Sequence, residues 1–433
     1  MPPDHSPALS RNRILVRAHQ GPFDNFSHLQ TLARQNLGAN VGNLLFSHSI
    51  YRLLATDAAS IAFDRFNTTD PGWVNENFDV VVLPLANAFR KNYIEELDRM
   101  SSIIEQLRIP VVVAGVNAQL GLKASEPKGG IGDSVTRFVR AILRNSPNIG
   151  VRGERTVRYL RKLGFSDDEL VIVGCPSMYT YGPDLPVPRL PEAITTESRI
   201  SLNLSPYVQG IGDLAIAQAA KYPHLVYTAQ DLPTLGLLLT GTYDTHLPVR
   251  PGFPASLDHP LVGSGRTVMP VNVPGWLEHL ARFDFSFGTR IHGNIAAILA
   301  GTPAYVLAHD SRTAELAEFH AIPHRTVGKD VASLDAAALY ADADYDAMLT
   351  RHKDTWAGFA GFLDMHGLRS IYSPDTRPGD FEERINAVDY PPVATLQPNR
   401  GPQVMVLRVG VIAERFARAV LGRLKRILPG FRR

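Results

Sequence analysis

The chain has 433 residues, of which 45% are hydrophobic and 20% charged, and its formal net charge at pH 7 is +2. These values exclude an intrinsically disordered protein, and the length fits two domains of about 150 to 200 residues each. The single cysteine, Cys175, excludes an internal disulfide and favours a reducing compartment.

The sequence shows no sign of export or membrane insertion. Its first residues, MPPDHSPALSRNR, lack the apolar stretch of a signal peptide. No uninterrupted apolar run reaches the roughly 20 residues that span a bilayer. We therefore expect a cytoplasmic protein.

The first half alternates short apolar runs with helical patterns. The runs cover 13–19, 78–86, 109–118, 148–154 and 170–177. Helical patterns between them include 43–56, 93–108 and 154–164. Strands that are apolar throughout are buried on both faces, as in a parallel sheet covered by helices. We therefore predict a doubly wound α/β domain over residues 10–180.

The proline-rich stretch 181–198 predicts an interdomain linker, because its four prolines prevent regular structure. A second doubly wound domain is predicted over 199–370. Its apolar runs cover 199–206, 224–230, 283–290 and 304–310, and its helical patterns 211–221, 231–240, 274–282, 291–300 and 313–321. Two such Rossmann-like domains would face each other across a cleft between the carboxyl ends of their strands, where ligands of these folds bind.

The stretch SFGTRIHGNIAAILAGTP places Arg290 and His292 where a predicted strand gives way to an apolar helix. Thr289 could cap that helix, and Gly293 would allow close approach. The helix dipole disfavours a cation at this position, so an anion is expected to offset it. A phosphate or a carboxylate would suit the arginine fork. Alternatively, Arg290 pairs with an acid of its own domain and His292 is a hydrogen-bonded turn residue.

The wider stretch 288–316 resembles the signature of the polysaccharide pyruvyl transferase family. The matching residues are Arg290, His292, Gly293, Gly301, Pro303, Asp310 and Arg312. The segments 151–165 with 173–178, and NLGANVGNLLFSHSI at 36–50, resemble two further parts of the family. In the motif at 36–50, the family usually carries an acidic residue after the glycine. The polar residues at this point of the present sequence are asparagines.

The resemblance implies the two-domain fold of GT-B glycosyltransferases and a reaction with phosphoenolpyruvate. Pyruvate would be installed as a ketal on two hydroxyls of a polysaccharide or a lipid-linked oligosaccharide. Arg290 would clamp the donor and His292 would protonate its methylene carbon, because a neighbouring anion raises the pKa of an imidazole. We predict donor-binding roles for Arg152, Arg155, Thr289 and Gly293.

Four further residues are candidates for supporting roles: Asp310, Arg312, Asn36 and Gly38. Asp310 would orient a cation or activate a hydroxyl, or else only cap the following helix. Alternatively, Arg152 and Arg155 form surface salt bridges, and Cys175 is expected to be a small buried group. Phosphoenolpyruvate is a substrate, and we expect neither a cofactor nor a metal.

Two other classes of function remain open. One is a glycosyltransferase that uses a nucleotide sugar, with Glu315 or Glu318 near the donor ribose. The other is a sugar-binding protein without catalytic activity. We expect no nucleic-acid partner, because the positive charge is confined to the tail and no aromatic stacking surface accompanies it.

The last segments are predicted as an extended tether over 371–403 and a basic amphipathic helix over 404–433. Between residues 408 and 433, eight basic residues stand against one acid, Glu414, and apolar residues recur every three or four positions. Such a helix suits the anionic inner face of the plasma membrane. The alternative is a helix docked on its own domain.

Overall fold

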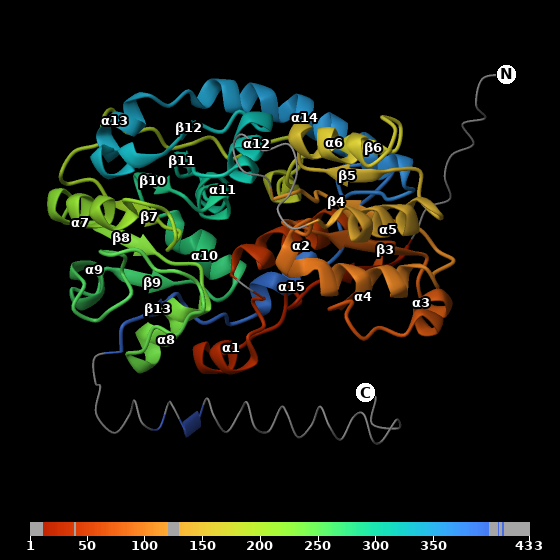
Figure 1. Cartoon of the computed structure of the whole chain (residues 1–433), viewed down its shortest axis with the longest axis horizontal. Helices are drawn as coiled ribbons and strands as arrows, with labels where there is room; N and C mark the ends of the chain where they lie inside the picture. The colour runs from red at the N-terminus through yellow and green to blue at the C-terminus, as the bar shows by residue number, and fades with distance from the viewer. Residues whose placement is uncertain (1–11, 39, 120–129, 398–405, 407–408, 411–433) are drawn as a thin grey trace.

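A computed structural model of the chain describes residues 12–38, 40–119, 130–397, 406 and 409–410 (Figure 1). Most of the predicted basic helix at 404–433 therefore lies outside the described residues. Within those ranges the chain is α/β, as predicted, with two Rossmann-like domains built on parallel sheets. None of the described helices combines the length and the apolar character needed to cross a bilayer.

The first domain contains a parallel sheet in the order β2-β1-β3-β4, and a parallel bridge between Val116 and Val151 continues it into the pair β5-β6. The strands are β1 (Arg13–Arg17), β2 (Ser60–Asp64), β3 (Val80–Pro84), β4 (Val111–Ala114), β5 (Ile149–Val151) and β6 (Leu170–Ile172). The helices are α1 (His28–Arg34), α2 (Gly42–Leu54), α3 (Pro71–Asn77), α4 (Ile94–Ile104), α5 (Gly132–Leu143) and α6 (Glu154–Lys162), with 3-10 turns at Lys91–Tyr93 and Pro176–Tyr179.

The central strands of this sheet are apolar throughout because both of their faces are covered. All of β3 is buried. Val80 and Val82 pack with residues of α2, whereas Val81 and Leu83 pack with residues of α4 and α5. Successive side chains of a strand point to opposite faces, so this alternation places helices on both sides of the sheet.

The second domain has a sheet in the order β12-β11-β10-β7-β8-β9-β13, parallel except for the last strand. The strands are β7 (Ile200–Asn203), β8 (Leu225–Thr228), β9 (Thr267–Met269), β10 (Phe285–Gly288), β11 (Ala304–Ala308), β12 (His324–Thr326) and β13 (Ala394–Thr395). The helices are α7 (Ile211–Lys221), α8 (Leu232–Thr240), α9 (Pro260–Gly263), α10 (Val273–Leu280), α11 (Ile291–Leu299), α12 (Ser311–Phe319), α13 (Ala336–Ala341), α14 (Tyr345–Met365) and α15 (Phe381–Ala387), with a 3-10 turn at Lys329–Ser333.

The end of the second domain returns to the first. The stretch 181–198 carries no helix or strand, and α14 runs back along the molecule toward α6 (Figure 1). Phe359 of α14 stacks on Tyr179 with ring centroids 4.6 Å apart, and His366 hydrogen-bonds to Asn148 at 3.0 Å. The last turns of α14 therefore belong to the packing of the first domain, although the predicted boundary placed them in the second.

An extended tether does not describe residues 371–403. Helix α15 lies within this range and buries Phe381 and Ile385 against Tyr51 and Ala55 of the α2 region. Further on, β13 pairs with β9 at the edge of the second sheet. The prolines of this segment prevent long elements, but its apolar side chains hold it against both domains.

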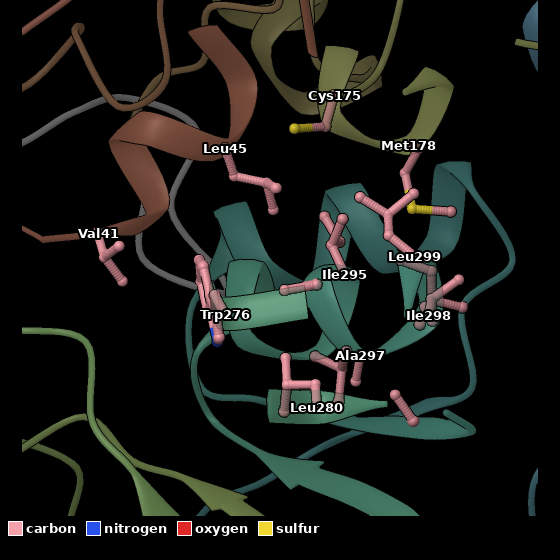
Figure 2. Close-up of a cluster of buried hydrophobic side chains, with 14 of the residues drawn as sticks. Val41, Leu45, Cys175, Met178, Trp276, Leu280, Ile295, Ala297, Ile298 and Leu299 are labelled. Carbon is pink, nitrogen blue, oxygen red and sulfur yellow. The ribbon is translucent and has the colours of Figure 1, made fainter. Parts of the chain in front are cut away.

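One hydrophobic cluster joins the two domains around α11 (Figure 2). Ile295 and Ile298 of this helix lie among Leu45 of α2 and Met178, which belong to the first domain, and Trp276 of α10. Because α11 is buried on nearly every side, its first residues are fixed in position relative to both domains. Arg290 and His292 stand at that end of the helix.

Candidate active site

A cavity of about 460 Å³ lies between the two domains. Its walls are the loops that follow β1, β3, β4 and β5 on one side and β7, β8, β10 and β11 on the other. These are carboxyl ends of parallel strands, the edge at which such folds bind ligands. The volume is within the range of small-molecule sites.

The turn between β10 and α11 depends on Gly288. Its φ is +146°, and a Cβ at this position would lie 1.8 Å from the carbonyl oxygen of Asn203. The backbone N–H of Arg290 donates to Asn203 Oδ1 at 2.9 Å, and Asn203 also donates to Asn294 Oδ1 at 2.9 Å. These contacts lock the start of α11 onto the end of β7.

Arg290 is the residue immediately before α11, and its side chain lines the cavity. Its Nη2 lies 3.1 Å from Asp231 Oδ2, and its Nε donates to the carbonyl oxygen of Leu204 at 3.1 Å. The alternative that Arg290 pairs with an acid of its own domain is therefore also true. The pairing fixes one edge of the guanidinium while the residue still faces the cavity.

Thr289 does not cap α11. Its hydroxyl accepts a hydrogen bond from the backbone N–H of Ser205 at 2.7 Å, and the residue is 1% exposed. It lines the cavity wall. Gly293, in contrast, does not line the cavity: a Cβ there would lie 2.3 Å from Nε2 of Gln230, which follows β8, and 3.0 Å from Cγ of Asn203 in β7, so this glycine allows the start of α11 to pack closely on both side chains.

His292 lines the cavity at the junction of the domains. Its Nε2 lies 3.7 Å from the sulfur of Cys175, and its ring centroid is 5.8 Å from that of Phe46. A Cβ on Gly42 would lie 2.9 Å from the Cβ of His292, so the first turn of α2 packs directly on this histidine. The ring is thus held by groups of the first domain.

The free protein holds His292 neutral. Burial, together with the positive charges of Arg152, Arg312 and Arg290, lowers its pKa to about 3. The sequence analysis expected a protonated His292 beside a bound anion, which is a different state from the free protein. A ligand with several negative charges would reverse this shift.

Arg152 lines the cavity and is 3% exposed. Its guanidinium donates to the carbonyl oxygens of Gly115 at 2.5 Å and Leu85 at 3.4 Å. Burial lowers the pKa of Arg152. A buried guanidinium that hydrogen-bonds only to carbonyls retains a net positive charge, which an anionic ligand could neutralise.

Arg312 lines the cavity and is oriented by Asp310, which stands behind it. Arg312 donates from Nε, at 3.0 Å, and from Nη2 to Oδ2 of Asp310. The other carboxylate oxygen accepts from the N–H of Thr313 at 3.0 Å, so Asp310 also caps α12. Burial opposes ionisation of Asp310, but the Arg312 guanidinium lowers its pKa to about 2.

Two further predicted site residues, Arg155 and Asn36, do not line the cavity. Arg155 pairs with Glu318 at 3.4 Å across the α6–α12 contact, because the second residue of α6 points away from the cavity. Asn36 is 2% exposed and donates to Gln20 at 2.8 Å. Gly38 does line the cavity; its φ is +62°, and a Cβ there would lie 2.9 Å from His19 Nε2.

The acids proposed for a nucleotide-sugar site face the first domain. Glu315 is 4% exposed and accepts from the N–H of Thr156 at 2.9 Å, while Glu318 pairs with Arg155. Burial raises the pKa of Glu315. Neither residue lines the cavity.

The structure adds cavity residues that the sequence analysis did not name. Arg17 ends β1 and His19 follows it, Arg90 follows β3, and His309 follows β11. The sequence could have indicated these four residues, because each stands within six residues of the carboxyl end of an apolar strand. Within the described ranges, no group of three or more His, Cys, Asp and Glu side chains is arranged to hold a metal ion.

Residues 40–311 match the family described as polysaccharide pyruvyl transferase. A comparison with curated proteins gives no significant match.

Among solved structures, the chain resembles MnaA of S. aureus in a structure with UDP, with 10% identity, a TM-score of 0.42 and coverage of 82% of this chain and 94% of that one. UDP-GlcNAc 2-epimerase from Neisseria meningitidis, bound to UDP-GlcNAc, is 11% identical, with a TM-score of 0.38 and coverage of 82% and 96%. The enzyme from Rickettsia bellii is 9% identical, with a TM-score of 0.42 and coverage of 82% and 96%. These likenesses concern the fold alone.

The family match covers well over half of the chain and includes the turn that carries Arg290 and His292. This protein therefore belongs to the polysaccharide pyruvyl transferase family.

Proposed function

We propose that this protein transfers pyruvate from phosphoenolpyruvate to two hydroxyls of a sugar and forms a ketal. The acceptor would be a cell-surface polysaccharide or a lipid-linked oligosaccharide precursor. The observation that supports this proposal most strongly is the grouping around His292 of Arg152, from the first domain, with Arg290 and Arg312, from the second.

The three arginines match the charges of the donor. Phosphoenolpyruvate carries a phosphate and a carboxylate, which need fixed cations at two positions. Arg290 and Arg312 are each held by an aspartate, and Arg152 by backbone carbonyls, so all three guanidiniums are oriented before the donor arrives. Preorganised cations stabilise charge without reorganisation at the moment of reaction.

The reaction requires a proton at the methylene carbon. His292, protonated when the donor binds, gives its proton to C3, and C2 becomes electrophilic. One sugar hydroxyl adds to C2 and loses its proton, which restores His292. The second hydroxyl then displaces phosphate, and its proton leaves with the phosphate. One phosphoenolpyruvate and one diol thus yield one ketal and one phosphate.

The direct test is incubation of the purified protein with phosphoenolpyruvate and a panel of sugar acceptors. We expect phosphate release to depend on the acceptor, and the acceptor to gain the mass of a pyruvyl ketal. His292→Gln should lose this activity while keeping its melting temperature within about 3 °C. A His292→Ala variant that keeps the biological activity of the protein in cells would favour a non-catalytic, sugar-binding role instead.

Thermal stabilisation separates this proposal from a nucleotide-sugar glycosyltransferase. A ligand at 100 times its Kd stabilises the folded state by about 2.7 kcal/mol. We expect phosphoenolpyruvate to raise the melting temperature, and uridine or guanosine diphosphate sugars to leave it unchanged. A shift with the nucleotide sugars alone would contradict the pyruvyl assignment.

We further propose that residues 404–433 bring the enzyme to an anionic membrane surface. Each basic residue near such a surface contributes about 1 kcal/mol. Removal of this segment should move the protein from the membrane pellet to the supernatant and leave turnover of a soluble acceptor largely intact. Loss of folding on truncation would instead indicate a docked helix.

A further inference from the structure

The first-domain wall of the cavity carries a second pair of cations that donor binding does not use. Arg17 ends β1 and Arg90 follows β3, whereas the proposed donor residues follow β5, β10 and β11. Arg17 is 8% exposed, and its Nε has no hydrogen-bond partner among the described residues. Its Nη2 forms an ion pair with Glu96 at 3.8 Å, a separation too long for a hydrogen bond.

Tyr93 holds the two arginines together. Arg17 Nη2 donates to the hydroxyl of Tyr93 at 2.9 Å, and the guanidinium carbon of Arg90 lies 5.4 Å from the centre of the Tyr93 ring. Arg90 Nε has no partner among the described residues, and burial lowers the pKa of Arg90. Arg17 is buried and Arg90 is half-buried, and a buried guanidinium N–H without a partner is costly unless an anion accepts from it.

The same wall also offers amide groups. Asn117, which follows β4, is 2% exposed and lines the cavity, and its Oδ1 lacks a partner among the described residues. An amide oxygen in this position can accept from a sugar hydroxyl. The wall thus combines groups that can bind hydroxyls with groups that can bind an anion. The cavity of about 460 Å³ has to hold both the acceptor and the donor.

We propose that the acceptor is an acidic sugar, whose carboxylate or phosphate is bound by Arg17 and Arg90 while its hydroxyls face the donor. This inference rests on the proposed function, because it names the acceptor class of the same reaction. It assigns acceptor charge to Arg17 and Arg90, and the donor to Arg152, Arg290 and Arg312.

The test compares matched acceptors at saturating phosphoenolpyruvate. Methyl hexosides, the corresponding methyl hexuronides and hexose 1-phosphates present neutral, carboxylate and phosphate forms of the same sugars. The hexose 1-phosphates keep the hydroxyls at C4 and C6, whereas the hexuronides keep only the pairs on the ring. We expect kcat/KM for one acidic class to exceed that of the neutral class by about 10- to 100-fold. Equal or better turnover of the neutral sugars would overturn the proposal.

Substitution of Arg17 assigns this preference to the first-domain wall. Arg17→Gln should raise KM for the preferred acidic acceptor by about 10- to 100-fold and leave KM for phosphoenolpyruvate within about twofold. Arg17→Lys should recover part of the loss. The control is Arg13→Gln, which removes a guanidinium from the other end of β1, where the side chain is 53% exposed. This control should change neither KM.

Two outcomes separate this inference from the reaction itself. If Arg17→Gln raises KM for phosphoenolpyruvate and not for the acceptor, Arg17 belongs to the donor site and the inference is wrong. If no acceptor is turned over, the proposed function fails. Calorimetric titration with methyl glucuronide and glucose 1-phosphate then still tests whether the wall binds acidic sugars, and binding of neither would overturn the inference as well.

Discussion

Binding of phosphoenolpyruvate should place a proton on His292. In the free protein, burial and the charges of Arg152, Arg312 and Arg290 lower the pKa of this imidazole to about 3. At pH 8, such a group is protonated in about one molecule in 100,000, and charging it would cost about 7 kcal/mol. Catalysis by imidazolium therefore requires the donor to supply this free energy.

The charge of the donor is sufficient. At pH 8 its phosphate is doubly ionised, and with the carboxylate it brings about three negative charges into the cavity. Two unit charges 4 Å apart interact by about 4 kcal/mol at an effective dielectric constant of 20. Two such contacts with the imidazolium would offset the cost, so we expect uptake of close to one proton per donor bound.

Calorimetry measures this uptake directly. Titration with phosphoenolpyruvate at pH 8, in buffers that differ in ionisation enthalpy, gives the number of protons as the slope of observed against buffer enthalpy. His292→Gln should still bind the donor through its arginines but take up almost no protons. Equal uptake by the variant and the original protein, or none by either, would refute a donor-induced protonation of His292.

Three further predictions concern the stability of the folded protein. Gly288→Ala should destabilise the protein by at least about 3 kcal/mol, because a Cβ would lie 1.8 Å from a carbonyl oxygen of β7; an unchanged melting temperature would contradict the turn geometry. Burial lowers the pKa of His48 to about 3, so the unfolded state binds one more proton below pH 6.5 and stability falls as the pH drops. His48→Gln should reduce the loss in unfolding free energy between pH 7 and pH 5 by about 2 kcal/mol, and an unchanged loss in denaturant titrations would rule this out. Glu315→Ala should lower the free energy of unfolding by about 1 to 3 kcal/mol, because it leaves the buried N–H of Thr156 unpaired. Glu318→Ala, at a side chain 51% exposed, should lower it by under about 1 kcal/mol. Equal effects of the two variants in thermal melts would argue against a stabilising hydrogen bond from Thr156 to Glu315.

The fold was predictable from the sequence because its central strands are apolar without alternation. Val80–Pro84 is buried on both faces, and a run of this kind is typical of a covered parallel sheet. The route of the last hundred residues was not predictable in this way. Phe381 and Ile385 lie four residues apart and form a small apolar face, but only the structure shows that this face packs beside α2.

The site was predictable where a side chain directly follows a strand. Arg290 and Arg152 stand in such turns and reach the cavity. Arg155 is three residues further along than Arg152, already inside α6, and it points toward Glu318. The sequence could not reveal the neutral state of His292, because that state depends on arginines that come from both domains.

In the proposed reaction, His292 protonates the methylene carbon of phosphoenolpyruvate, and pyruvate then joins the acceptor. Incubation in deuterated water followed by mass spectrometry of the product tests it most directly. We expect each modified acceptor to carry one pyruvyl ketal with one deuterium in its new methyl group, and an equal amount of released phosphate. Absence of a pyruvyl product with every acceptor, or a product methyl group without deuterium, would contradict the account.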